Sequence, residues 1–161
     1  MRDWLVGGAL IEGPDGVLLV HNRRRNGSHD WSPPGGVIDE GETVLAGLSR
    51  EVTEETGLVV REWSEPVYEI EVVAADLGWR LRVESYRALD YEGDLVIDDP
   101  DGIVVDACFV ATERCAHHLG GTPQWVCEPL TEWLVTRWSG LRSFGYDVAG
   151  SDLGSLSVKR R

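Results

Sequence analysis

The stretch GVIDEGETVLAGLSREVTEETGL, residues 36–58, decides how this chain folds and what chemistry it offers. From Glu42 to Thr56 the composition favours a helix, and Gly57 can end that helix in the left-handed conformation. On a helical wheel, a sector of roughly 100° holds the apolar side chains of Val44, Leu45, Leu48 and Val52. We therefore expect one face of the helix to pack against a sheet.

Three carboxylates on this helix lie beside the apolar stripe and not opposite it. Glu55 falls between Val44 and Leu48 in angle. Glu51 borders the stripe, and Glu54 lies one step further round. Mutual repulsion, desolvation and the helix dipole each disfavour this arrangement by roughly 0.3 to a few kcal/mol. A bound Mg²⁺ or Mn²⁺ would offset all three penalties, because hard cations prefer oxygen ligands.

The residues around these carboxylates fit a metal site as well. Arg50 lies four positions before Glu54 and can hold that carboxylate in one orientation. Gly35 and Gly36 have no Cβ, so their backbone can approach a ligand closely or form a tight turn. A free carbonyl there could join the metal shell. The alternative interpretation is a surface helix whose end is merely rich in glutamate.

Residues 36–58 resemble the Nudix box, the signature of the Nudix hydrolase family. The matching positions are Gly36, Glu42, Arg50-Glu51, the aliphatic Val52, Glu54-Glu55, Gly57 and the aliphatic Leu58. The resemblance implies an α+β or α/β fold, namely an α/β/α sandwich with a mixed β-sheet. It also implies hydrolysis of a pyrophosphate bond in a nucleoside diphosphate linked to another moiety, X.

The same resemblance implies a role for each site residue. Metal ligands would be Glu51, Glu54 and Glu55, joined by the carbonyl of Gly36, with Mg²⁺ or Mn²⁺ as the cofactor. The general base would be Glu54 or Glu55, and we favour Glu54. Arg50 would orient the site and Glu42 would support it. In the acidic loop 90–102, the carboxylates of Asp98, Asp99 and Asp101 are further candidates for a ligand or base, or are simply solvated.

Substrate choice depends on residues outside this stretch. Among Arg23, Arg24 and Arg25 we expect phosphate binding, with Arg23 and Arg25 as candidates and solvated loop charge as the alternative. Trp31 could stack on a base, although Trp is more often a core residue. Downstream signatures of hydrolases for ADP-ribose, dinucleoside polyphosphates and NADH are missing. By elimination we expect a nucleoside triphosphate, oxidised or not, that yields a monophosphate and pyrophosphate.

Other functions remain open at this point. The substrate could be an NDP-sugar or another dinucleotide, or the domain could sense a nucleotide without cutting it. An isoprenoid-type isomerase would need a catalytic thiol, for which Cys108 is the candidate. A zinc site at Cys115, His117, His118 and Cys127 is a further alternative, although its spacing matches no regular zinc pattern.

Length and composition bound these hypotheses. The chain has 161 residues, of which 42% are hydrophobic and 27% charged, as expected of one globular domain. A formal net charge of −13 argues against long nucleic acids but is compatible with a small nucleotide bound through cations. We expect a cytoplasmic protein, because there is no membrane-spanning apolar run or signal peptide and the cysteines suit a reduced state. A homodimer stays open.

The remaining pattern predicts mainly strands. A hairpin is expected from runs 3–12 and 17–22, joined by a turn at 13–16. Further strands are expected at 58–61, 66–74, 79–89 and 103–110, and further helices at 112–119 and 129–141. We expect a catalytic domain over residues 1–143 and a flexible tail over residues 144–161, which are rich in Gly and Ser.

Overall fold

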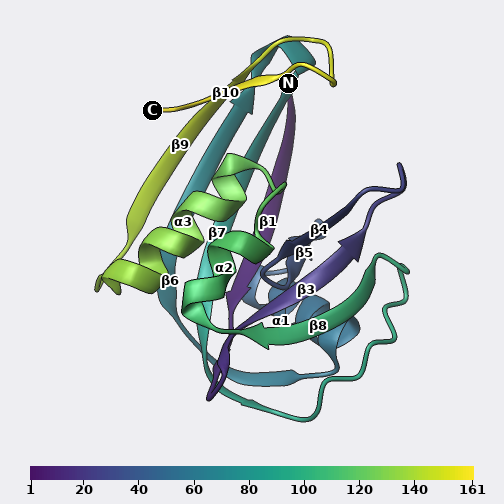
Figure 1. Ribbon diagram of the computed structural model, residues 1–161, viewed down its shortest axis with the longest axis vertical. Helices are drawn as coiled ribbons and strands as arrows, with labels where there is room; N and C mark the ends of the chain where they lie inside the picture. The colour runs from purple at the N-terminus through teal and green to yellow at the C-terminus, as the bar shows by residue number, and fades with distance from the viewer.

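The computed structural model describes residues 1–161 and places a large mixed sheet at the centre of the molecule (Figure 1). The strand order is β10-β9-β6-β7-β1-β5. β1 runs parallel to β7, and β6 runs parallel to β9, whereas the other neighbours are antiparallel. The strands of this sheet are β1 (Arg2–Leu10), β5 (Gly35–Val37), β6 (Val59–Ala74), β7 (Trp79–Glu92), β9 (Arg142–Ala149) and β10 (Ser157–Arg160).

A second, antiparallel sheet is built around β3, which pairs with each of its other strands. Its strands are β2 (Glu12–Gly13), β3 (Gly16–Arg23), β4 (His29–Ser32) and β8 (Val104–Val110). The expected hairpin is confirmed for β2 and β3, which meet at the predicted turn. β1 does not belong to that hairpin, because it pairs with β5 and β7 of the large sheet.

Strand β3 is buried on both faces and divides the core in two. Val17 and Leu19 pack on the side of α2 and α3, whereas Leu18 and Val20 pack on the side of α1. Figure 1 shows α2 and α3 in front of the strands and α1 behind them. The predicted α/β/α sandwich with a mixed sheet is confirmed. The helices are α1 (Val44–Thr56), α2 (Thr112–His118) and α3 (Gln124–Thr136), and none is long and apolar enough to cross a membrane.

The ends of α1 follow from its sequence. The Thr43 side chain accepts a hydrogen bond from the Ala46 amide, which caps the first turn. Gly57 ends the helix with a φ of 82° and donates its N–H to the Thr53 carbonyl. Between these caps, Leu48 and Val52 are fully buried, as the apolar stripe predicts, whereas Leu45 of the same stripe is 36% exposed. The helix is therefore held in one rotational setting against the sheets.

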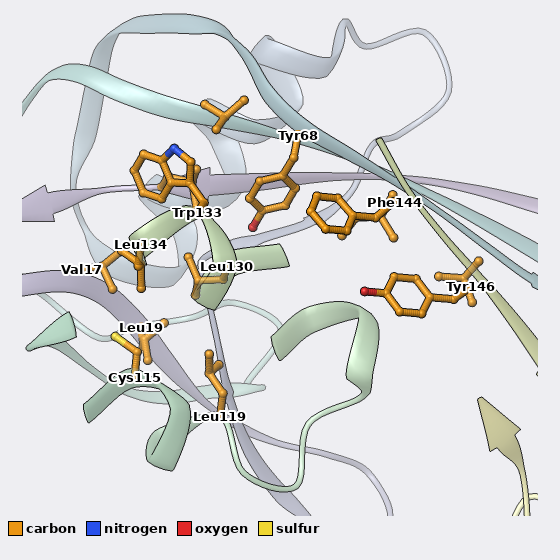
Figure 2. Close-up of a cluster of buried hydrophobic side chains, with 14 of the residues drawn as sticks. Val17, Leu19, Tyr68, Cys115, Leu119, Leu130, Trp133, Leu134, Phe144 and Tyr146 are labelled. Carbon is orange, nitrogen blue, oxygen red and sulfur yellow. The ribbon is translucent and has the colours of Figure 1, made fainter. Parts of the chain in front are cut away.

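The chain beyond residue 143 is not a flexible tail, so that expectation is wrong. β9 pairs in parallel with β6, and β10 pairs with β9. Phe144, Tyr146 and Val148 alternate into the core beside α3, and Figure 2 shows Phe144 beside Tyr68. The Gly- and Ser-rich composition belongs to the turn between these strands. The alternation of inward- and outward-facing residues along β9 is the pattern that indicates a strand, but the Gly- and Ser-rich composition of the segment obscured it.

Helix α3 also differs from its predicted range, since it spans 124–136 and not 129–141. It begins directly after Pro123 and ends at Arg137, whose φ of 51° is left-handed. The early start brings Trp125 and Val126 onto the helix, where both line the cavity described below.

The burial of β9 leads to a first prediction. Phe144→Ala should lower the free energy of unfolding by about 3 kcal/mol or more, because it removes a buried ring that packs against Tyr68 and Trp138. Urea denaturation measures this loss, with the exposed Leu153→Ala as the control. A loss below about 1 kcal/mol would mean that β9 is not part of the core.

Glu12 joins three distant segments through two ion pairs. Its carboxylate accepts hydrogen bonds from Arg137, just after α3, and from Arg87 on β7 at 3.0 Å. These bonds, above all the one from Arg137, hold the pKa of Glu12 below its ordinary value of 4.5 despite partial burial. Glu12 therefore stabilises the folded chain in its charged form.

Glu12→Gln should lower stability by about 1 kcal/mol near neutral pH, a small value because both arginines are partly exposed. Since the folded-state pKa is lowered, this contribution is present above the unfolded pKa and is lost as pH falls through the folded one. Urea unfolding of both proteins from about pH 7 to about pH 3 should show the gap closing. A gap that stays constant over this range would contradict the ion-pair assignment.

Candidate active site

A cavity of about 550 Å³ lies where the two sheets separate. Its walls come from β1, β5, β6 and β7 of the large sheet, from β3 and β4 of the small sheet, and from α1 and α3. One part carries the carboxylates of Glu51 and Glu55. Much of the remaining wall is apolar, with contributions from Ile70, Leu81, Val83, Trp125 and Val126. A partly apolar cavity with a few convergent polar groups is typical of a small-molecule site.

Arg50 organises the carboxylates at this end of the cavity. Its Nε and Nη2 donate to the two oxygens of Glu42, each at 2.9 Å, in a bidentate pair. Its Nη1 donates to Glu54 at 3.2 Å and to Glu51 at 3.3 Å. The bond from Arg50 and a second from the Asp39 amide lower the pKa of Glu42 to about 2. The orienting and supporting roles expected of Arg50 and Glu42 fit this geometry.

Glu55 is the most deeply buried carboxylate of the cluster, with 7% of its surface exposed. Burial raises its pKa to about 9, and the nearby Glu51 and Asp99 add to the shift, whereas the Gly35 amide opposes it. The pKa of Glu51 is also raised, first by burial. A cation bound between these carboxylates would instead favour their ionised forms.

Two glycines allow the backbone of β5 to approach these glutamates. The Gly35 amide lies 3.4 Å from Glu55 Oε2. A Cβ on Gly36 would lie only 2.7 Å from the carboxyl carbon of Glu51, closer than real Cβ contacts come. The missing side chain at Gly36 therefore lets the Glu51 carboxylate rest directly on the β5 backbone.

The three aspartates of the acidic loop differ in their positions and hydrogen bonds. The carboxylate of Asp99 caps the loop, accepting hydrogen bonds from the amides of Asp101, Ile103 and Val104. Asp101 also lines the cavity, and its carboxylate accepts no hydrogen bond from the protein. Asp98 does not line the cavity. A hydrogen bond from the Val96 amide to the Thr56 carbonyl holds this loop against the end of α1.

The donor set fits a divalent cation in its chemistry, although it is not a preformed cage. No group of three or more His, Cys, Asp or Glu side chains is arranged to hold a metal ion. Arg50 instead engages Glu54 and Glu51, and Glu54 does not line the cavity. Glu51 and Glu55 face the cavity, their donors are hard oxygens, and the bare backbone of Gly36 leaves room beside them. The residues present therefore fit Mg²⁺ or Mn²⁺.

Three of the predicted substrate-binding residues lie outside the cavity. Trp31 stacks on His21, with ring centroids 4.6 Å apart, on the face of β3 and β4 that points away from the cavity. Arg23 and Arg25 do not line the cavity either, whereas the intervening Arg24 does. Arg23 is the last residue of β3, whereas Arg24 and Arg25 belong to the loop that follows, where Arg24 pairs with Asp30 of β4. The structure therefore does not bring Arg23, Arg25 or Trp31 to the cavity.

The thiols also lie away from this site. Cys115 is a buried free thiol that donates to the carbonyls of Val110 and Ala111. Cys108 is a half-buried residue of β8 that packs against the core and does not line the cavity. The isomerase alternative, which needs a thiol in the cavity, has no support in this geometry.

Comparison with known proteins gives a consistent result. A family model described as the NUDIX domain matches residues 2–124. An RNA pyrophosphohydrolase of Caulobacter vibrioides is 29% identical over 114 residues, covering 62% of this chain and 66% of that protein. A MutT-like protein of Streptomyces ambofaciens is 46% identical over 55 residues, or 34% of each chain. The oxidized purine nucleoside triphosphate hydrolase of Mus musculus is 43% identical over 51 residues, covering 32% of this chain and 33% of that protein.

The matches to the first curated relatives are short, spanning about a third or less of each relative's length. Solved structures are similar over nearly the whole chain. A MutT protein from Bacillus halodurans has a TM-score of 0.67 at 19% identity, covering 98% of this chain and 97% of that one. A MutT NUDIX hydrolase from Burkholderia pseudomallei has a TM-score of 0.65 at 21% identity, covering 84% and 98%. At these identities the structural likeness establishes the fold.

The close approach at Gly36 yields a prediction about metal binding. Gly36→Ala should weaken Mg²⁺ binding by about tenfold or more while the fold persists, because the added Cβ displaces the Glu51 carboxylate. Isothermal titration calorimetry measures the affinity, and Gly154→Ala in an exposed turn is the matched control. Unchanged Mg²⁺ affinity in a folded Gly36→Ala protein would show that Glu51 does not hold the cation.

Proposed function

This chain belongs to the NUDIX family, and on that premise we propose that it hydrolyses a pyrophosphate bond in a nucleoside diphosphate linked to X. The substrate class that we propose is the nucleoside triphosphate, oxidised or not, with a monophosphate and pyrophosphate as products. The observation that carries the proposal is that the half-buried Glu51 and the buried Glu55 face a cavity beside the carboxylates that Arg50 holds. The names RNA pyrophosphohydrolase and oxidized purine nucleoside triphosphate hydrolase, borne by two relatives, support this reaction type.

Within this proposal, the cation ligands are Glu51, Glu54, Glu55 and the carbonyl of Gly36. Bound Mg²⁺ or Mn²⁺ would supply charge neutralisation at the phosphates and a lowered pKa for the attacking water. Arg50 keeps the cluster compact, since it pairs with Glu42 on one side and with the helix glutamates on the other. Asp101, whose carboxylate is unengaged at the cavity wall, is a further candidate ligand or base.

The attacking water must lose a proton, and we assign the acceptance of this proton to a glutamate. Water attacks one phosphorus, the bridging P–O bond breaks, and the water proton passes to a carboxylate acting as general base. The sequence favours Glu54 for this role, with Glu55 as the alternative. We propose Glu55, because it lines the cavity, whereas Glu54 is hydrogen-bonded to Arg50 and does not line the cavity.

The proposal also includes a cytoplasmic location. Three cysteines remain free thiols, and such cysteines are typical of proteins in a reducing compartment. The substrate is a small molecule, since the net charge of −13 repels long polyanions.

The proposed reaction is tested by a screen of nucleoside triphosphates and NDP-sugars with Mg²⁺, followed by product analysis in ¹⁸O-labelled water. The proposal predicts a monophosphate and pyrophosphate from at least one triphosphate, with ¹⁸O in one product that identifies the attacked phosphorus. Turnover of NDP-sugars alone would change the substrate class. Nucleotide binding without any product would show a sensing domain and contradict the proposed hydrolysis.

A further prediction tests both candidate bases. Glu54→Gln or Glu55→Gln should lower kcat by about 10² to 10⁴-fold without unfolding the protein, since each amide can neither accept the proton nor ligate the cation as a carboxylate does. The exposed Glu40→Gln, at the start of the same segment, should leave kcat unchanged. Turnover near that of the unaltered protein in both active-site variants would exclude both assignments.

A further inference from the structure

Asn22 is a buried polar residue on the cavity wall that none of the preceding chemistry uses. It lies near the end of β3 with 5% of its surface exposed. The register of β3 and β4 places it opposite Asp30, while His21 lies opposite Trp31. Because strand residues alternate, Asn22 faces the cavity and the ring of Trp31 lies on the opposite face.

Both N–H groups of the Asn22 amide are engaged by the protein. Nδ2 donates to Asp30 Oδ1 at 3.0 Å and to Ser32 Oγ at 2.8 Å. Asp30 in turn accepts two hydrogen bonds from Arg24, at 2.8 and 2.9 Å. Although burial alone would raise the pKa of Asp30, the bonds from Arg24 and Asn22 hold it below the ordinary value.

This network fixes which way the Asn22 amide points. An ionised carboxylate can only accept hydrogen bonds, so Asp30 requires the NH₂ group of Asn22 and excludes its carbonyl oxygen. Oδ1 is therefore left without a donor from the protein. No buried side-chain oxygen in the chain lacks a partner, so Oδ1 must be accessible, and the space that Asn22 borders is the cavity. The wall thus presents one oriented acceptor.

An acceptor of this kind selects its partner by chemistry. A phosphate oxygen carries no proton and would be repelled, the more so because the Asp30 carboxylate lies behind the amide. Arg24 does not reverse this, since its Nε and Nη2 are already committed to Asp30. The matching group is a neutral donor, either a sugar O–H or a base N–H. In the proposed substrate such donors belong to the nucleoside half.

We propose that Asn22 is a specificity-determining residue whose Oδ1 accepts a hydrogen bond from a neutral donor on the nucleoside half of the substrate. Asp30 is the positioning residue that fixes the amide, and Arg24 anchors Asp30. The inference rests on the proposed function for the identity of the ligand. It goes beyond that function by naming the group that is read and the residue that reads it.

Binding of nucleoside monophosphates, measured by calorimetry, tests this without requiring turnover. Matched pairs separate the two donor sources: AMP with dAMP and GMP with dGMP for the sugar, and AMP with purine riboside monophosphate and GMP with IMP for the base. The unaltered protein should bind the donor-bearing member of at least one pair about tenfold more tightly. Asn22→Leu should bind both members of that pair equally, while its affinity for inorganic pyrophosphate with Mg²⁺ stays unchanged.

Two outcomes of this experiment would overturn the inference. The first is an absence of discrimination in the unaltered protein, or discrimination that survives Asn22→Leu. The second is an equal loss of affinity for pyrophosphate and for every nucleotide, which would make Asn22 a phosphate contact.

The role of Asp30 is tested with a variant that keeps its shape. Asp30→Asn can accept and donate, so the Asn22 amide is free to turn over, and the affinity ratio of the discriminating pair should fall toward one. Arg23→Gln, next to Asn22 but outside the cavity, should leave the ratio unchanged. Thermal melting accompanies each variant. If Asn22→Leu does not fold, Asp30→Asn decides, because a preserved ratio in folded Asp30→Asn overturns the inference.

Failure of this inference and failure of the proposed function are distinguishable. Hydrolysis with unaltered selectivity in Asn22→Leu would contradict the inference about Asn22 and would still agree with the proposed function. Selective binding that depends on Asn22, without hydrolysis of any nucleotide, would support the inference about Asn22 and contradict the proposed function.

Discussion

The bidentate pair between Arg50 and Glu42 is the interaction on which the acidic end of the cavity depends. It ties the loop before α1 to the middle of that helix, at 2.9 Å for each of two bonds. From this fixed position the remaining guanidinium nitrogen reaches Glu51 and Glu54. The positive charge of Arg50 thereby neutralises part of the negative charge of these carboxylates, which would otherwise repel each other. The positions of the site glutamates follow from that arrangement.

The burial of Glu55 has an energetic cost that the surrounding fold accommodates. Burial raises the pKa of Glu55 to about 9, so its charged form is unfavourable inside the fold unless a proton or a cation offsets the charge. Leu48 and Val52 hold the same helix against the sheets through fully buried contacts. The acidic flank is consequently presented by a rigid element, which is what precise placement of reacting groups requires.

Local sequence predicted the parts of the molecule that depend on a single element. The helical spacing of the apolar residues and the helix-ending Gly57 located α1. The angular position of Glu55 relative to Val44 and Leu48 predicted the burial of Glu55 correctly. The positions of residues that depend on pairing between distant segments could not be predicted from local sequence. Arg24 lines the cavity where the loop after β3 brings it to Asp30 of β4, and β9 joins the sheet by pairing with β6. Neither of these long-range pairings is encoded in a local pattern.

The recognition network illustrates the same limit. Asn22, Asp30 and Ser32 are ordinary polar residues along the sequence, and nothing in their spacing marks them. Their hydrogen bonds arise once a hairpin brings two strands together with alternate residues on one face. The end of β3, His21-Asn22-Arg23, is polar throughout, so no local alternation of polar and apolar residues could have located Asn22.

The central claim is that the acidic cluster at the end of α1 binds divalent cations at the cavity. Paramagnetic broadening of backbone amide signals by substoichiometric Mn²⁺ tests this residue by residue. The account predicts that the amides of Gly35, Gly36 and residues 51–57 broaden first, together with those of the loop near Asp101. Broadening that is centred instead on another acidic surface, such as the strand around Glu69 and Glu71, would contradict it.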